Sequence, residues 1–202
     1  MSLKTSYRFI APFYDIFLRR ATHNARQRSL SRLPRSGKAQ VLLSGSGTGL
    51  DFPFLPPCHE YTALDFTDAM LARSTPRAGN LHMQWVRGDS MALPFAAGSF
   101  DYVVLHLIVA VVPQPQRCLA EAARVLKAGG RILVFDKFLR RGERAWLRRG
   151  LTPLIGQLAT RLDVVFEDVL EMMPGLRVLS DQPALARGWF RLIELQKEEM
   201  DV

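Results

Sequence analysis

The sequence predicts an α/β fold built around a mostly parallel sheet. Short apolar segments alternate along the chain with stretches of helical character, which is typical of strands joined by helical crossovers. One segment, YVVLHL at residues 102–107, is apolar almost throughout, as expected for a strand that is buried on both faces. A glycine-rich stretch, VLLSGSGTG at residues 41–49, contains the first of these strands. We expect a single domain, because 202 residues lie near the usual domain size of about 100–200.

Residues 1–36 are predicted to form a basic, amphipathic helical arm. Apolar residues recur three or four positions apart between Ile10 and Ala25, so they share one face of a helix. Residues 1–40 carry nine basic groups against one acid, Asp15, and so contain the whole net charge of +8. A basic arm attracts nucleic acid or an anionic membrane surface, and an ordinary solvated helix face is the simpler alternative.

Residues 37–138 are predicted to form the core of the sheet. Five strands are expected there, at residues 40–44, 61–64, 83–86, 100–106 and 131–135. The clearest helix is expected at residues 115–126, and a turn at Lys127–Gly130 precedes the fifth strand.

The last third of the chain departs from the alternation. Residues 139–173 are expected to form a helical insert that covers the site as a lid, because this stretch is rich in arginine and leucine. Residues 174–202 are expected to contain two final strands, at residues 176–179 and 189–195, paired as a hairpin at the edge of the sheet.

The glycine-rich turn is predicted to bind a cofactor that contains a nucleoside. Gly45, Gly47 and Gly49 let the backbone approach a ligand where a side chain would collide. In open parallel sheets an acid at the end of the second strand, about 20 residues further on, holds the ribose hydroxyls. Asp65 stands at that spacing, and Asp89 follows the third expected strand.

Composition excludes several other classes of protein. No apolar run approaches the about 18–20 residues that cross a bilayer, and the N-terminus lacks the features of a signal peptide. The two cysteines, Cys58 and Cys118, provide neither a disulfide framework nor a metal-binding spacing. We therefore expect a cytoplasmic protein that needs no metal ion.

Five segments in this order resemble the class I S-adenosylmethionine-dependent methyltransferases. They are VLLSGSGTG, ALDFTDAML, GDSMALPF, SFDYVV and ARVLKAGGRILV, and the resemblance extends over residues 7–197. It implies a Rossmann-like, seven-stranded, mostly parallel sheet with an antiparallel last strand and helices on both faces. It also implies methyl transfer as the reaction, S-adenosylmethionine as the cofactor and S-adenosylhomocysteine as the product.

The resemblance assigns cofactor-binding roles to residues at the ends of the first four strands. Asp65 would hold the ribose, Phe66 and Asp89 would lie beside the adenine, and His106 would face the methyl donor. Loop capping by the two acids and core packing by Phe66 are the structural alternatives. The full implied set is Ser44, Gly45, Ser46, Gly47, Gly49, Asp65, Phe66, Met70, Asp89, Ser90, Met91, Leu105 and His106.

One position departs from the family pattern. The family commonly has an acid at the position of Leu43, where it helps to organise the amino-acid end of the cofactor. Because this chain has leucine there, the cofactor ammonium must be held by backbone carbonyls or by a group from elsewhere, such as Asp51 or the N-terminal arm.

The expected reaction needs few catalytic groups. Methyl transfer from a sulfonium is a direct displacement, so holding donor and acceptor in line can provide most of the rate enhancement. If the acceptor is an amine, its proton must be taken up; His106 is the best-placed candidate and Tyr14 the second. A wall residue without a proton role is the alternative for His106.

The variable segments point to the substrate. SYRFIAPFYD in the arm resembles the entrance helix of methyltransferases that act on quinones and phospholipids. Residues 151–171 and 179–197 resemble the bacterial phospholipid N-methyltransferases, which implies phosphatidylethanolamine as the acceptor. In that interpretation the basic arm contacts the anionic inner face of the membrane peripherally.

Other acceptors and functions stay open. A quinone precursor or another small molecule, methylated on carbon or oxygen, is the main alternative to a lipid. A nucleic-acid methyltransferase is disfavoured, because the usual Asn/Asp-Pro-Pro-aromatic motif is replaced by LHLIVAV after the fourth strand. A nicotinamide-dependent oxidoreductase would prefer GxGxxG to the GxGxG found here, and a non-catalytic cofactor-binding protein is supported only by the missing acid.

Overall fold

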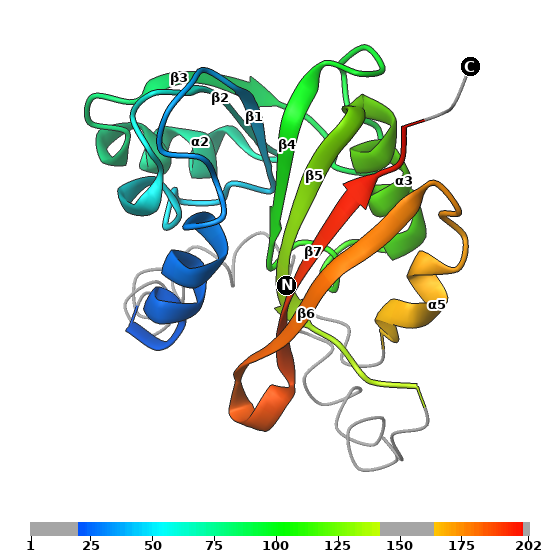
Figure 1. Ribbon diagram of the computed structural model, residues 1–202. Helices are drawn as coiled ribbons and strands as arrows, with labels where there is room; N and C mark the ends of the chain where they lie inside the picture. Colours follow the sequence, from blue (N-terminus) through cyan, green and yellow to red (C-terminus); the bar gives the residue numbers. More distant parts are fainter. Residues whose placement is uncertain (1–19, 142–163, 200–202) are drawn as a thin grey trace, which may run out of the picture.

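The computed structural model describes residues 20–141 and 164–199, in which seven strands form one sheet (Figure 1). The strand order is β3-β2-β1-β4-β5-β7-β6. β1 to β5 are parallel, whereas β7 is antiparallel to both β5 and β6. The strands are β1 (Gln40–Ser44), β2 (Glu60–Asp65), β3 (His82–Arg87), β4 (Phe100–His106), β5 (Leu126–Lys137), β6 (Leu176–Leu185) and β7 (Phe190–Lys197). The predicted fold class is confirmed.

Helices cover both faces of this sheet. A helix ending at residue 30, described from residue 20, leads into β1, and Figure 1 shows it at the edge where the parallel strands end. The labelled helices are α2 (Asp68–Ser74), α3 (Pro115–Val125) and α5 (Phe166–Leu170). Short 3₁₀ turns complete the connections: η1 (Phe52–Phe54), η2 (Thr75–Arg77) and η4 (Ala186–Gly188).

The alternation of side chains along β1 divides the core in two. Leu42 packs in a cluster with α3 and α5, whereas Val41 and Leu43 pack on the opposite face with Leu30 from the first helix and Phe52 from η1. Successive residues of a strand point to opposite faces, so both faces of this strand are apolar and buried. The near-continuous apolar runs in the sequence have this cause.

One local expectation differs from the structure, and parts of two others lie outside the described residues. The turn expected at Lys127–Gly130 belongs to β5, which begins at Leu126 and is irregular where it pairs with β4. The connection after the glycine turn is only the short η1, in which Pro53 is the second residue and after which Pro56 and Pro57 follow. Only α5, at the end of the expected helical insert, is described, and residues 142–163 lie outside the described part of the chain, as do residues 1–19 of the arm.

Candidate active site at the carboxyl ends of the strands

The glycine turn after β1 combines tight packing with open space. Gly45, Gly47 and Gly49 all have positive φ angles, of 75°, 54° and 78°. A Cβ on Gly45 would lie 2.7 Å from the side chain of Ile108, whereas a Cβ on Gly47 would meet nothing within 4 Å. The hydroxyl of Ser46 between them is buried and has no hydrogen-bond partner. The turn thus offers a bare backbone surface and one unused polar group to a ligand.

Asp65 lies against this turn, as the spacing predicts. Its Oδ2 accepts a hydrogen bond from the backbone N–H of Gly47 at 2.9 Å, and its Oδ1 accepts one from the N–H of Thr67 at 3.0 Å. Thr67 in turn caps the N-terminus of α2 through the N–H of Met70. The carboxylate is therefore fixed in orientation at the junction of β1, β2 and α2.

The residues expected around an adenine ring lie at the ends of β2 and β3. Phe66 is 69% exposed, which excludes core packing as its explanation. Asp89 accepts the N–H of Met91 at 2.8 Å, the loop-capping contact considered above, and the hydroxyl of Ser44 donates to Ser90 at 2.9 Å. An exposed aromatic face beside a fixed carboxylate suits a nucleoside, so the residues present fit the expected cofactor.

A buried polar network lies at the end of β4. His106 Nδ1 is 2.7 Å from Asp51 Oδ1, and its Nε2 is 2.9 Å from Ser29 Oγ. Arg26 donates from Nη1 to the same Asp51 oxygen at 2.8 Å and from Nε to Thr22 at 2.9 Å. All five residues are buried, so the network joins the first helix to the glycine turn and to β4.

Electrostatics favour an ionised Asp51 in this network. Burial opposes ionisation, but the charge of Arg26 and the contacts with His106 hold the pKa of Asp51 far below its usual range. At the end of β5 the balance is reversed, because burial raises the pKa of Asp136 although it accepts the N–H groups of Ala110 and Lys137. The pKa of buried Asp51 is therefore lowered, whereas the pKa of buried Asp136 is raised.

The backbone at the end of β4 is strained. Leu107, directly after His106, has φ +58°, a conformation that non-glycine residues rarely adopt. Its N–H donates to the carbonyl of Phe135 in β5 at 2.7 Å. Such strain is typical of functional sites, and here it fixes where β4 ends, with His106 as its last residue and Leu107 as the first residue of the loop.

The sequence interpretation found part of this arrangement. It placed Asp65 beside the glycine turn and His106 at the end of β4, and it named Asp51 only as an alternative. It missed Arg26 and Ser29, although their spacing from Thr22, four and seven positions along a helix, predicts one polar face. Tyr14 lies outside the described residues.

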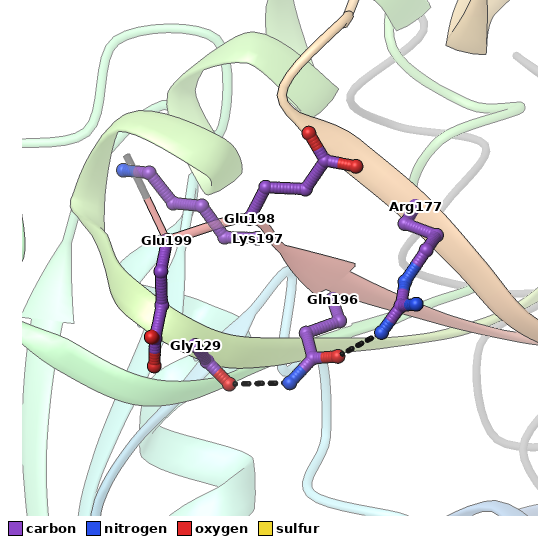
Figure 2. A pocket seen from close by; sticks show the side chains of 6 residues that line it. All are labelled: Gly129, Arg177, Gln196, Lys197, Glu198 and Glu199. Carbon is purple, nitrogen blue, oxygen red and sulfur yellow. Dashed lines mark hydrogen bonds between the residues drawn. The ribbon is translucent and has the colours of Figure 1, made fainter. Parts of the chain in front are cut away.

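A hollow in the surface lies elsewhere. It has a volume of about 400 Å³ and is lined by Gly129, Arg177, Gln196, Lys197, Glu198 and Glu199 (Figure 2). Gln196 bridges the carbonyl of Gly129 and the guanidinium of Arg177 there. This hollow contains none of the predicted site residues and lies at the opposite edge of the sheet.

Searches for a metal site and for a membrane span gave no candidate in residues 20–141 and 164–199. No group of three or more histidine, cysteine, aspartate or glutamate side chains in these ranges could hold a metal ion. No helix in the same ranges is long and apolar enough to cross a bilayer.

Comparison with known proteins gives the family. A methyltransferase domain family matches residues 42–134. A phosphatidylethanolamine N-methyltransferase from Cereibacter sphaeroides is 30% identical over 189 residues, which cover 91% of this chain and 92% of that protein. The chain belongs to the class I S-adenosylmethionine-dependent methyltransferases. S-adenosylmethionine is accordingly its cofactor.

Other methyltransferases match a shorter part of this one. The ubiquinone/menaquinone biosynthesis C-methyltransferase UbiE of Roseobacter denitrificans is 38% identical over 109 residues, which are 51% of this chain and 44% of that protein. Among solved structures, YcgJ from Bacillus subtilis has a TM-score of 0.71 at 16% identity, with 88% of this chain and 99% of that chain covered. A methyltransferase from Thermotoga maritima has a TM-score of 0.68 at 18% identity, with 95% and 98% covered. These two structures support the fold alone.

Proposed function

We propose that this methyltransferase transfers methyl groups to the amine of phosphatidylethanolamine. The observation that carries the proposal is the extent of the match. The phosphatidylethanolamine N-methyltransferase aligns with 91% of this chain, whereas UbiE aligns with 51%. Both kinds of relative need the same cofactor core, so acceptor preference must depend largely on segments outside it. Similarity in those segments favours the lipid amine.

Charge on the described part of the arm supports contact with an anionic membrane. Residues 20–38 hold six basic residues and no acid. Arg26 is buried in the site, but Arg20, Arg28, Arg35 and Lys38 are exposed. Each basic residue near an anionic leaflet contributes about 1 kcal/mol, so a few of them give reversible attachment. We propose that this surface brings the enzyme to its lipid substrate.

The site residues act mainly by orientation in this proposal. S-adenosylmethionine supplies a methyl group that its sulfonium centre makes reactive. The glycine turn and Asp65 fix the two ends of the cofactor, while the strained end of β4 sets the wall where the acceptor approaches. An in-line arrangement of donor and acceptor then lowers the barrier without a covalent intermediate.

His106 is proposed to take the proton that the amine must lose. Ionised Asp51 can only accept, so Nδ1 of His106 carries the hydrogen and Nε2 is the basic atom. Nε2 now accepts from the hydroxyl of Ser29, which must turn away before an amine proton can reach it. Tyr14 is the second candidate for this role.

Methylation of a quinone precursor is the second candidate function. The higher identity to UbiE, 38% against 30%, favours it within the matched segment. The lipid is preferred because the UbiE match covers only 44% of that protein's length.

A direct assay separates these candidates. Purified protein would be incubated with methyl-labelled S-adenosylmethionine and vesicles of phosphatidylglycerol with phosphatidylethanolamine. Matched vesicles would contain phosphatidylcholine, whose nitrogen is already fully methylated, and parallel tubes a quinone precursor or bulk RNA. We expect label only with phosphatidylethanolamine, and none with the Asp65→Ala variant. Label in the quinone precursor or RNA but not in lipid would overturn the proposal.

The role of His106 needs a separate test. His106→Asn should lower kcat at least about tenfold, since general base catalysis contributes about 10²–10⁴-fold. The affinity for S-adenosylhomocysteine should change much less, and the pH dependence of kcat should flatten. An unchanged pH profile would instead identify His106 as a wall residue.

A further inference from the structure

We infer that Arg26 and Asp51 together hold the zwitterionic amino-acid end of the cofactor. This inference rests on the membership of the methyltransferase family and not on the lipid substrate. It assigns to a helix of the N-terminal arm, together with the glycine turn, the task that an acid at the position of Leu43 would otherwise perform.

Leu43 cannot take part in this task. Its side chain is apolar, 1% exposed and packed in the core with Val41 and Phe52. Asp51 stands two residues after Gly49, and the backbone of the turn connects them through the N–H of Phe52, which donates to the carbonyl of Gly49 at 3.2 Å. An acid is therefore present at the cofactor turn, but it comes from its far end.

Arg26 keeps one hydrogen-bond donor, and Asp51 one acceptor, that no described group uses. Arg26 bonds Asp51 through Nη1 and Thr22 through Nε, and both contacts to Asp51, from Arg26 and from His106, reach Oδ1. No other described group bonds Nη2 of Arg26 or Oδ2 of Asp51. Both side chains are only 7% exposed, yet neither atom is among the fully buried polar atoms without a partner, so a small ligand can reach both.

The chemistry of the unused atoms matches an α-amino acid. A carboxylate oxygen accepts from an ammonium group, and a guanidinium donates to a carboxylate, in charge-assisted hydrogen bonds that are shorter and stronger than neutral ones. An α-amino acid carries both charges on one carbon, so an adjacent Arg–Asp pair can bind both at once.

A second observation independently points to a ligand at the same place. The hydroxyl of Ser46 is buried without a hydrogen-bond partner, and Gly47 beside it faces open space. Asp51 follows this turn by two residues, so the turn and the Arg26–Asp51 pair can together provide donors and acceptors to one ligand. His106 and Ser29 also belong to this network, but they already form a hydrogen bond with each other.

The alternative is an ion pair that only stabilises the fold, and ligand analogues separate the two. S-adenosylhomocysteine carries the amino-acid end, whereas 5′-methylthioadenosine has the same nucleoside and thioether without it. Binding of both to the full chain would be measured by calorimetry for wild type, Arg26→Met and Asp51→Asn. Arg28→Met is the matched control, because Arg28 is exposed on the same helix.

We expect affinity for S-adenosylhomocysteine to fall about 10- to 100-fold in both variants, as for a lost charge-assisted hydrogen bond. Affinity for 5′-methylthioadenosine should change less than about twofold, and the control should bind both as wild type does. Equal losses for the two ligands would show a structural role and overturn the inference, as would no loss for either. Neither result depends on which acceptor is methylated.

A double variant avoids the misfolding that a single unpaired buried charge can cause. Asp51→Asn leaves a buried guanidinium without its partner, which can itself unfold the chain. Arg26→Met combined with Asp51→Leu removes both charges, and such apolar replacements are often tolerated. This protein should still bind 5′-methylthioadenosine and lose S-adenosylhomocysteine. Retained affinity for S-adenosylhomocysteine would contradict the inference.

Decarboxylated S-adenosylmethionine assigns the two roles separately. It keeps the amine and lacks the carboxylate, so Arg26→Met should bind it as wild type does. Asp51→Asn should bind it more weakly. The reverse pattern would overturn the assignment of ammonium to Asp51 and carboxylate to Arg26.

Discussion

The two edges of the sheet contain similar residues that differ in how far their polar groups are hydrogen-bonded. At the carboxyl edge, a left-handed glycine faces open space, and a buried arginine and aspartate keep unused polar atoms. At the amino edge, the hollow of Figure 2 also has a left-handed glycine and charged side chains, but several of its groups are already bonded, as Gln196 is to Gly129 and Arg177. Lys197, for example, donates to the carbonyls of Ala123 and Leu126. The size of a hollow therefore does not by itself mark the site.

The largest expected difference between the edges concerns two carboxylates that accept backbone N–H groups. Asp65 accepts from Gly47 at the carboxyl edge, and Asp101 accepts from Gln40 at the start of β4. Asp65→Ala should weaken binding of S-adenosylhomocysteine about 100-fold, because it removes the carboxylate that we propose as the acceptor for the ribose hydroxyls. Asp101→Ala should cost about 1 kcal/mol of stability and leave the affinity unchanged. Calorimetry and urea unfolding measure the two effects, and equal affinities would contradict the location of the site.

A pair of glycines sharpens the same comparison. Gly45 and Gly129 have φ angles of 75° and 72°, so alanine at either costs about 1–2 kcal/mol of backbone strain. At Gly45 the added Cβ also meets Ile108 at 2.7 Å, whereas at Gly129 it meets only the flexible end of Glu199 at 3.2 Å. Gly45→Ala should lose at least about tenfold in cofactor affinity as well as more stability. Cofactor affinity that fell equally in both variants would break the distinction.

The free energy of unfolding at low pH should distinguish Asp51 from an ordinary carboxylate. Because its pKa is lowered in the folded state, its stabilisation is fully present above the ordinary value of 3.8 and is lost as the pH falls below it. The wild type should therefore lose about 2 kcal/mol more than Asp51→Asn as the pH falls from 5 to 2. Urea unfolding at a series of pH values tests this, and parallel curves for the two proteins would refute it.

The smallest expected effect concerns the two thiols, neither of which is used by the site. Burial raises the pKa of Cys118 to about 12, whereas Cys58 is half-buried. A thiol reagent should label Cys58 in the native protein and both cysteines in urea, with Cys58→Ser leaving no native label. Rapid native labelling of Cys118 would show that α3 opens more readily than its packing indicates.

The prediction from sequence succeeded where the physics is local. Alternating apolar runs predicted strands buried on both faces, and the spacing between the glycine turn and Asp65 predicted a contact that the structure contains. The roles of Met70, Met91 and Leu105 at the cofactor, and of Tyr14, remain predictions.

The sequence by itself determined where the strands of the core lie and which edge carries the glycine turn, because these follow from periodicity and from glycines whose conformation few residues can replace. The resemblance of its ordered motifs to a known family implied the class of reaction. Only the tertiary structure decided the partners of Asp51. Arg26 lies 25 residues before it and His106 lies 55 residues after it, and no local pattern connects them. Packing of the first helix against the ends of β1 and β4 brings the three together, since burial of the apolar face of that helix fixes where its polar residues lie.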